Sequence, residues 1–424
     1  MSNTGYTNYL LLNQNQLKAL NYFWIGFIIY TIGFTLLVTS KINYNVCEGI
    51  EILGMVLFVI SSFFLLEFKF DNKYLKLVFI LYMLWLSTVV FRGFNLRPDF
   101  IKIMLFHDYV GIFPFLAPLV LLFPKNLIVY RKIFSVSIIL AVVCVLYYIV
   151  FIRELMNRDI SSLVSKGVME NSARHLALPI TFLLLAYSYQ SKSIKLLALF
   201  VTMLTVFFTI IRARRGLLFS FVNPIIFGYI IFLTESKKKF SMIMIVLFSA
   251  LIVALFGLQF VNNSSLFNSF KSRVDEDTRS GVEKCFVKDM ETSDWIVGRG
   301  IDGSYYCPGI DPDDRTGYRT VIETDYLNII LKGGIISLSL LLFITVPAAI
   351  KGIFYSKNIL SKAAGFWILM WLLSLYPTTG VAFIFSYLLL WICVGICYNE
   401  DIRGIPENVM KLYFESFKSL PKNV

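Results

Sequence analysis

Three arginines stand together in the segment Arg212-Ala213-Arg214-Arg215-Gly216, between the apolar runs 196–211 and 217–234. A guanidinium group left at the centre of a bilayer costs about 2.5–3.5 kcal/mol, so these side chains must reach water, lipid headgroups or a bound anion. The planar guanidinium binds phosphate and carboxylate oxygens in pairs. The segment, called the Arg turn below, therefore predicts an anion site. The alternative is that its arginines contact lipid phosphates at helix ends.

One long polar segment, 261–323, is expected to lie in the same compartment as the Arg turn. A loop of this length is usually functional or disordered. Its aromatic residues favour order and suit stacking against sugar rings; they are Trp295, Tyr305, Tyr306 and Tyr318. Residues 284–290 fit a short amphipathic helix. We therefore expect the Arg turn and this loop to bind an anionic, lipid-linked substrate together.

Four side chains are candidates for proton transfer. Glu323 and Asp325 stand where the loop enters the next apolar run, and partial burial there raises a carboxylate pKa toward that of a general base. The alternative is that they cap the first turn of a helix. His107 and His175 lie at the ends of apolar runs, where a histidine serves either as a base or as an interfacial hydrogen-bonding group.

The cysteines indicate a disulfide and no metal centre. Cys285 and Cys307 both fall in the long polar loop, where an oxidising compartment would allow them to pair. The sequence has no Cys-x-x-Cys motif and no His/Cys cluster with metal spacing, so we expect no metal ion. It also lacks a P-loop and a Rossmann fingerprint, so we expect no nucleotide cofactor.

The composition is that of a membrane protein. Of 424 residues, 57% are hydrophobic and only 16% are charged, which is too apolar for a soluble globule. The net charge of +12 would suit a nucleic-acid partner, but the basic residues lie in short loops between apolar runs. Membrane orientation and anionic lipids explain that placement, so we expect membrane lipids and no nucleic acid as partners.

The predicted fold is an all-α polytopic bundle of about twelve membrane-spanning helices, because runs of about 17–25 apolar residues are long enough to cross a bilayer. The chain then divides into helices within 1–260, the polar loop 261–323, helices within 324–398 and a tail 399–424. The predicted spans are 21–39, 50–68, 75–91, 103–123, 133–152, 176–189, 196–211, 217–234, 240–260, 326–350, 363–376 and 381–398.

The distribution of basic residues predicts the orientation. With twelve spans both termini share one side, and the opposite side holds 13 of the 15 arginines but only 7 of the 24 lysines. Long loops contribute little to the positive-inside rule, so the short, lysine-rich loops beside the termini decide the outcome. We expect cytoplasmic termini and an outer face whose arginines select oxyanions.

In these residues the chain resembles the bacterial O-antigen polymerase and ligase superfamily of GT-C-type membrane glycosyltransferases. The resemblance covers nearly the whole chain, with an Arg-Gly turn before the eighth span and then a long periplasmic loop. Asp277-Thr278-Arg279 resembles the family's Gly-Arg segment, Trp295-Ile296-Val297-Gly298-Arg299-Gly300 resembles its Gly-x-Gly segment, and Glu323-x-x-Tyr326-Leu327 with Gly334-Ile335 resembles the entry to the next helix. Ligases typically carry His-Asn where this chain has Glu323-Thr324, which favours a polymerase.

The resemblance implies an enzyme of the bacterial inner membrane that polymerises repeat units of O-antigen, or of a related surface polysaccharide, at the periplasmic face. Its substrate would be a glycan on undecaprenyl pyrophosphate, and a chain-length regulator would be a further partner. Arginines can neutralise the leaving pyrophosphate without a metal ion or cofactor. The expected pyrophosphate ligands are Arg212, Arg214, Arg215, Arg273 and Arg279, with Arg215 also catalytic, and the expected glycan ligands are Trp295, Arg299, Tyr306 and Asp325.

In this interpretation Glu323 deprotonates or orients the acceptor hydroxyl, and His175 and His107 are the alternative bases. Three other functions remain open. A ligase would transfer the glycan to lipid A core or protein, a flippase or transporter would move the charged lipid without making bonds, and a membrane scaffold would do neither.

Overall fold

The computed structural model describes residues 12–39, 42–70, 72–157, 162–235, 279–309, 316–378 and 380–416. Over these residues the chain is helical apart from one two-residue strand pair, as the all-α prediction requires. Seven of the described helices are long and apolar enough to cross a membrane, so the chain is a polytopic membrane protein. They are α1 (Gln14–Leu37), α2 (Tyr44–Phe63), α3 (Lys73–Gly93), α6 (Leu127–Val150), α10 (Lys192–Ile211), α11 (Arg215–Glu235) and α16 (Asp325–Phe354).

The last two predicted spans form shorter helices at the centre of the bundle. These are α17 (Ile359–Ser374) and α18 (Phe385–Tyr398). Every residue of α18 is buried, which explains why its sequence is apolar on all sides. The core therefore surrounds α18, which packs against α16, α17 and the 3-10 helix η2 (Ala117–Leu122).

Two of the predicted spans were wrong as continuous helices. The run 103–123 divides into α4 (Pro98–Phe106), α5 (Phe113–Leu116) and η2, and prolines stand at the start of each piece. The run 176–189 divides into the π-helix η3 (Ser172–Ala177), η4 (Leu178–Ile180), α9 (Thr181–Leu185) and η5 (Tyr187–Tyr189). A proline lacks the backbone N–H that a continuous helix needs, so apolar length alone overestimated the spans. The ninth predicted span, 240–260, lies outside the described residues.

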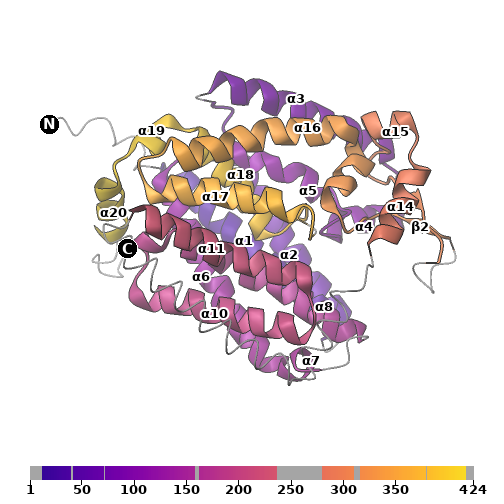
Figure 1. Cartoon of the computed structure of the whole chain (residues 1–424), viewed down its shortest axis with the longest axis horizontal. Helices are drawn as coiled ribbons and strands as arrows, with labels where there is room; N and C mark the ends of the chain where they lie inside the picture. The colour runs from indigo at the N-terminus through magenta and orange to yellow at the C-terminus, as the bar shows by residue number, and fades with distance from the viewer. Residues whose placement is uncertain are drawn as a thin grey trace.

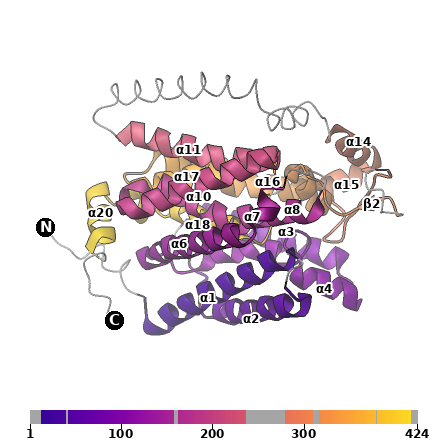
Figure 2. The ribbon, with the colours of Figure 1, turned by 90° about the horizontal axis from the view of Figure 1, so that it is seen from below.

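The polar elements gather at the two ends of the bundle (Figure 1). At one end lie α19 (Glu400–Gly404) and α20 (Glu407–Ser416), and at the other lie α14 (Ser280–Asp289), α15 (Thr292–Val297) and the strands β1 (Tyr305–Tyr306) and β2 (Tyr318–Arg319). Figure 2 shows the same separation from a second direction. We call the end that carries α14, α15, β1 and β2 the loop end. The short helices α7 (Ile152–Leu155) and α8 (Leu163–Asn171) also lie toward it.

The elements of the loop end share a small core of their own. Phe286 of α14 and Tyr305 of β1 are fully buried and pack edge to face, with ring centroids 5.6 Å apart. A disulfide joins Cys285 to Cys307, the pair predicted from their shared loop. Helix α14 covers the predicted helical segment 284–290 except for its last residue. These elements, called the loop unit below, are therefore a folded body and not an open loop.

The loop unit is fixed to the bundle at a break in α16. Gly334 has φ of +69°, which interrupts the helix, and its missing side chain leaves room for the backbone of Ile296. The carbonyls exposed by the break accept hydrogen bonds from the loop unit, from Arg299 N to Leu331 O at 2.7 Å and from Gly300 N to Lys332 O at 2.9 Å. The Trp295–Gly300 segment therefore caps the C-terminal end of the first part of α16.

Candidate functional site

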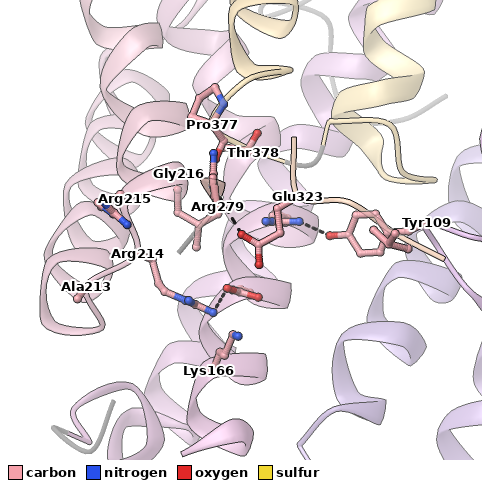
Figure 3. A pocket seen from close by; sticks show the side chains of 14 residues that line it. Tyr109, Lys166, Ala213, Arg214, Arg215, Gly216, Arg279, Glu323, Pro377 and Thr378 are labelled. Atoms are coloured by element: carbon pink, nitrogen blue, oxygen red, sulfur yellow. Dashed lines mark hydrogen bonds and ion pairs between the residues drawn. The ribbon is translucent and has the colours of Figure 1, made fainter. Parts of the chain in front are cut away.

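A cavity of about 400 Å³ opens at the loop end, between the Arg turn and the loop unit (Figure 3). Helices α8, η3 and α11, the N-terminus of α14 and the connection between α17 and α18 all contribute to it. Its lining residues are Tyr109, Lys166, Glu170, Arg174, Ala213, Arg214, Arg215, Gly216, Leu217, Arg279, Val321, Glu323, Pro377 and Thr378. The two segments that the sequence predicted to act together thus meet at one site.

The cavity carries an excess of positive charge. Five cationic side chains line it, against the two carboxylates of Glu170 and Glu323, which leaves a net charge of +3; the cations are Lys166, Arg174, Arg214, Arg215 and Arg279. Guanidinium groups near low-dielectric walls attract anions more strongly than the same groups in open water. The site therefore suits a ligand with two or three negative charges, such as a diphosphate.

The Arg turn is short because Ala213 adopts a left-handed conformation, with φ of +50°. Backbone hydrogen bonds from Ala213 N to Ile210 O at 3.0 Å and from Arg214 N to Thr209 O at 2.9 Å close the turn. Arg215 then begins α11, so it stands at the positive end of that helix dipole. Gly216 is needed here because a side chain would approach Pro377 O to 2.4 Å.

Two ion pairs orient the cavity arginines. Arg214 pairs with Glu170 of α8, and Arg279 Nε lies 3.6 Å from Glu323 Oε2. Arg279 also donates to the carbonyls of Tyr376 at 2.9 Å and Pro377 at 2.7 Å, which ties the loop unit to the α17–α18 connection. Figure 3 shows Arg214, Arg279 and Glu323 directed into the same space. An incoming oxyanion would meet donors that already have fixed directions.

Sequence reasoning missed four members of the site, namely Tyr109, Lys166, Glu170 and Arg174. Arg174 donates to the Tyr109 hydroxyl, and its guanidinium lies 5.7 Å from the centroid of that ring. Burial raises the pKa of Tyr109 above its usual range, so the hydroxyl keeps its proton and can itself donate. The sequence shows Arg174 beside His175, just before the predicted span 176–189. It does not show the irregular helix η3, which directs Arg174 into the cavity.

Two predicted ligands, Arg212 and Arg299, have protein partners away from the cavity. Arg212 is buried outside the cavity, where it donates to Asn157 O at 2.6 Å and Ser162 O at 3.4 Å. Arg299 pairs with Asp289 at 2.5 Å and Asp294 at 2.7 Å inside the loop unit. Neither guanidinium group lines the cavity, and both contact other parts of the protein.

The remaining predicted glycan ligands divide between buried and exposed positions. Asp325 is fully buried, and its Oδ2 accepts from Gly380 N at 2.6 Å and Val381 N at 2.5 Å. Trp295 packs edge to face on Phe286, with centroids 5.5 Å apart. Of the predicted glycan-binding set, Tyr306 alone presents an exposed aromatic ring. Arg273, a predicted pyrophosphate ligand, lies outside the described residues.

Neither histidine lines the cavity. His175 is 1% exposed, its Nε2 lies 3.4 Å from Asp108 Oδ2, and its ring stacks on Phe34. His107 is partly exposed, and its Nδ1 accepts from the backbone N–H groups of Tyr109 at 3.2 Å and Val110 at 3.3 Å. In the described part of the chain, Glu323 is the better-placed base, because its side chain is 65% exposed and lines the cavity.

A second, smaller cavity of about 50 Å³ continues from the first toward the apolar core. The two share Arg174, Leu217 and Thr378 in their walls. Its lining is mostly apolar and comes mainly from α11 and α17, including Leu178, Phe219, Trp367, Met370, Trp371 and Ile384. A charged cavity is therefore adjacent to a small, mostly apolar crevice.

Within the described ranges no group of three or more His, Cys, Asp or Glu side chains is placed to hold a metal ion. No protein-family description, no curated protein and no solved structure matches this chain. The candidate function therefore rests on the chemistry of the cavity.

The two neighbouring carboxylates should respond differently to removal. Asp325→Ala leaves the N–H groups of Gly380, buried, and Val381, partly buried, without their acceptor, so we expect a loss of about 2–3 kcal/mol of stability. Glu323→Ala removes an exposed side chain and should change stability by less than about 0.5 kcal/mol. Thermal unfolding of the purified variants in nanodiscs measures both. Equal destabilisation by the two changes would contradict this division of roles.

Proposed function

We propose that this protein is a glycosyltransferase of the bacterial cytoplasmic membrane that joins polyprenyl-pyrophosphate-linked glycan repeat units, with its loop end facing the periplasm. The observation that carries the proposal is the meeting of Arg214 and Arg215 with Arg279 and Glu323 in one charged cavity. The first two residues come from a turn between apolar helices, and the others come from the segment that the sequence predicted to face it.

The charge and shape of the cavity support a diphosphate leaving group. A diphosphate diester carries two negative charges, and the net charge of +3 around the cavity can neutralise both. Arg214, Arg215 and Arg279 line the cavity, so their guanidinium charge lies beside a phosphate bound there, and Arg215 adds the positive end of α11. As the bond to the sugar breaks, negative charge grows on the leaving phosphate, so these donors favour the transition state.

The apolar crevice below supports a lipid carrier. Its entrance is shared with the cavity through Arg174, Leu217 and Thr378, so a phosphate held by the arginines has an apolar space beneath it. Burial of apolar surface contributes roughly 25 cal/mol per Å² to binding. A polyprenyl chain would gain this energy in the crevice, whereas a free nucleotide sugar has no lipid chain to bury.

The position of Glu323 supports a role as the base. The carboxylate accepts the proton of the acceptor hydroxyl, whose oxygen forms a bond to the anomeric carbon of the donor. The bond from that carbon to the phosphate oxygen breaks on the opposite face, and the diphosphate leaves with the electron pair. The anomeric configuration is therefore inverted. The ion pair with Arg279 holds the Glu323 carboxylate beside the proposed phosphate site.

Replacement of Arg215 tests the anion site. Arg215→Ala should lower the rate of chain extension by about 10²–10³-fold, which is typical when one donor to a developing oxyanion is removed. The measurement is the initial rate of glycan ladder formation from purified lipid-linked repeat units by protein in nanodiscs. Lys288→Ala is the matched control, because Lys288 is an exposed cation of α14 outside the cavity. A wild-type rate for Arg215→Ala at equal stability would refute the proposal, and transfer to lipid A core without ladders would identify a ligase.

Replacement of Glu323 tests the base. Glu323→Gln should reduce the rate by about 10²–10⁴-fold, because the amide cannot accept the proton, while binding of the lipid-linked donor should persist. Ladder formation and donor binding, measured on the same preparation, separate the two effects. Unchanged ladders in Glu323→Gln would remove this residue from catalysis.

A further inference from the structure

The loop unit leaves two aromatic side chains exposed. Trp295 and Tyr305 pack into its small core, whereas Tyr306 is 47% exposed and Tyr318 is 55% exposed. The two exposed tyrosines stand directly opposite one another on β1 and β2, with ring centroids 5.3 Å apart. We call them the tyrosine pair.

The tyrosine pair is held rigidly. Cys307, the residue after Tyr306, is tied to α14 by its disulfide and donates from its backbone N–H to Gly317 O at 2.7 Å. Gly317 has φ of +68°, and a side chain there would approach the Tyr306 ring to 2.9 Å. The glycine therefore lets this ring lie against the hairpin. Aromatic rings fixed in this way lose little conformational freedom when they bind a ligand.

The hairpin is also connected to the rim of the charged cavity. Val321 lines the cavity, and its carbonyl accepts from the Tyr305 hydroxyl at 3.3 Å. Tyr318 is three residues before Val321, so their Cα atoms are at most about 11 Å apart at 3.8 Å per trans peptide. A chain of sugars whose first residue reacts beside Glu323 can reach the tyrosine pair within a few residues.

A cross-strand aromatic pair also stabilises a hairpin, and tyrosines also anchor proteins at membrane interfaces. The location argues against the second role. Strand β2 projects at the loop end beyond the outer end of α16, away from the apolar helices (Figures 1 and 2). The hairpin therefore lies at the end of the bundle where the glycan of a substrate held in the cavity would extend.

We propose that Tyr306 and Tyr318 form a sugar-stacking subsite, which holds glycan residues away from the reacting end so that the chain leaves the cavity in one direction. The C–H faces of the sugar rings pack on the tyrosine rings, and the tyrosine hydroxyls meet the sugar hydroxyls. This inference rests on the proposed function, because it assigns the glycan of the same substrate. It makes the loop unit a part of substrate binding in addition to a support for Glu323.

The test separates the glycan from the diphosphate. The probes are inorganic pyrophosphate and the glycan released by mild acid from the lipid-linked pool of the native host, each titrated calorimetrically into full-length protein in nanodiscs. The variant Tyr306→Leu/Tyr318→Leu keeps an apolar pair but removes both flat rings, whereas Tyr306→Phe/Tyr318→Phe keeps them. Tyr355→Leu is the control, because Tyr355 is 68% exposed at the far end of α16.

We expect the leucine variant to raise the Kd for the glycan about tenfold, as the loss of two ring contacts implies, and to leave the Kd for pyrophosphate unchanged. The phenylalanine and Tyr355 variants should bind both probes like the wild type. An equal glycan Kd in the leucine variant and the wild type, or no glycan binding by the wild type, would overturn the subsite and leave the proposed function standing. A wild-type protein that fails to bind pyrophosphate would instead overturn the proposed function.

Discussion

Guanidinium groups beside hydrocarbon must be neutralised, and much of the loop end is built to meet that requirement. Arg214 turns toward Glu170, while Arg279 reaches Glu323 and two carbonyls of the α17–α18 connection. Each contact joins segments that are far apart in the sequence, so the charges that need compensation also define the cavity. The net positive charge that remains after these pairings is what a substrate anion would neutralise.

Breaks in the helices determine where the loop unit and the charged side chains of the cavity lie. A continuous α16 would leave no exposed carbonyls for the loop unit, whereas the break at Gly334 allows Arg299 and Gly300 to cap its first segment. This cap fixes the loop unit to the end of the first segment of α16, and Glu323 precedes the start of that segment by two residues. The π-helix η3 acts in a similar way, because it presents Arg174 to the cavity and turns His175 inward. Irregular backbone thus positions the groups that carry the chemistry.

The sequence predicted the membrane class, most of the long helices and the disulfide, because apolar length and shared loops are local properties. The distribution of charge also led us to expect the Arg turn and the segment that ends at Glu323 in the same compartment, and both line one cavity. The sequence could not reveal Tyr109, which lies at a break within the apolar run 103–123, and it did not show that Lys166 and Glu170 of α8 line the same cavity. Arg299 and Asp325 were assigned to the glycan because the sequence does not show that Asp289 and backbone N–H groups already satisfy them.

The most direct measurement is an experimental structure of the full-length protein in nanodiscs with undecaprenyl pyrophosphate bound. We predict density for the diphosphate within hydrogen-bonding distance of Arg214, Arg215 and Arg279, and density for the lipid chain entering the crevice between α11 and α17. Diphosphate density at the opposite end of the bundle, beside α19 and α20, would contradict the assignment of this cavity as the site of glycosyl transfer.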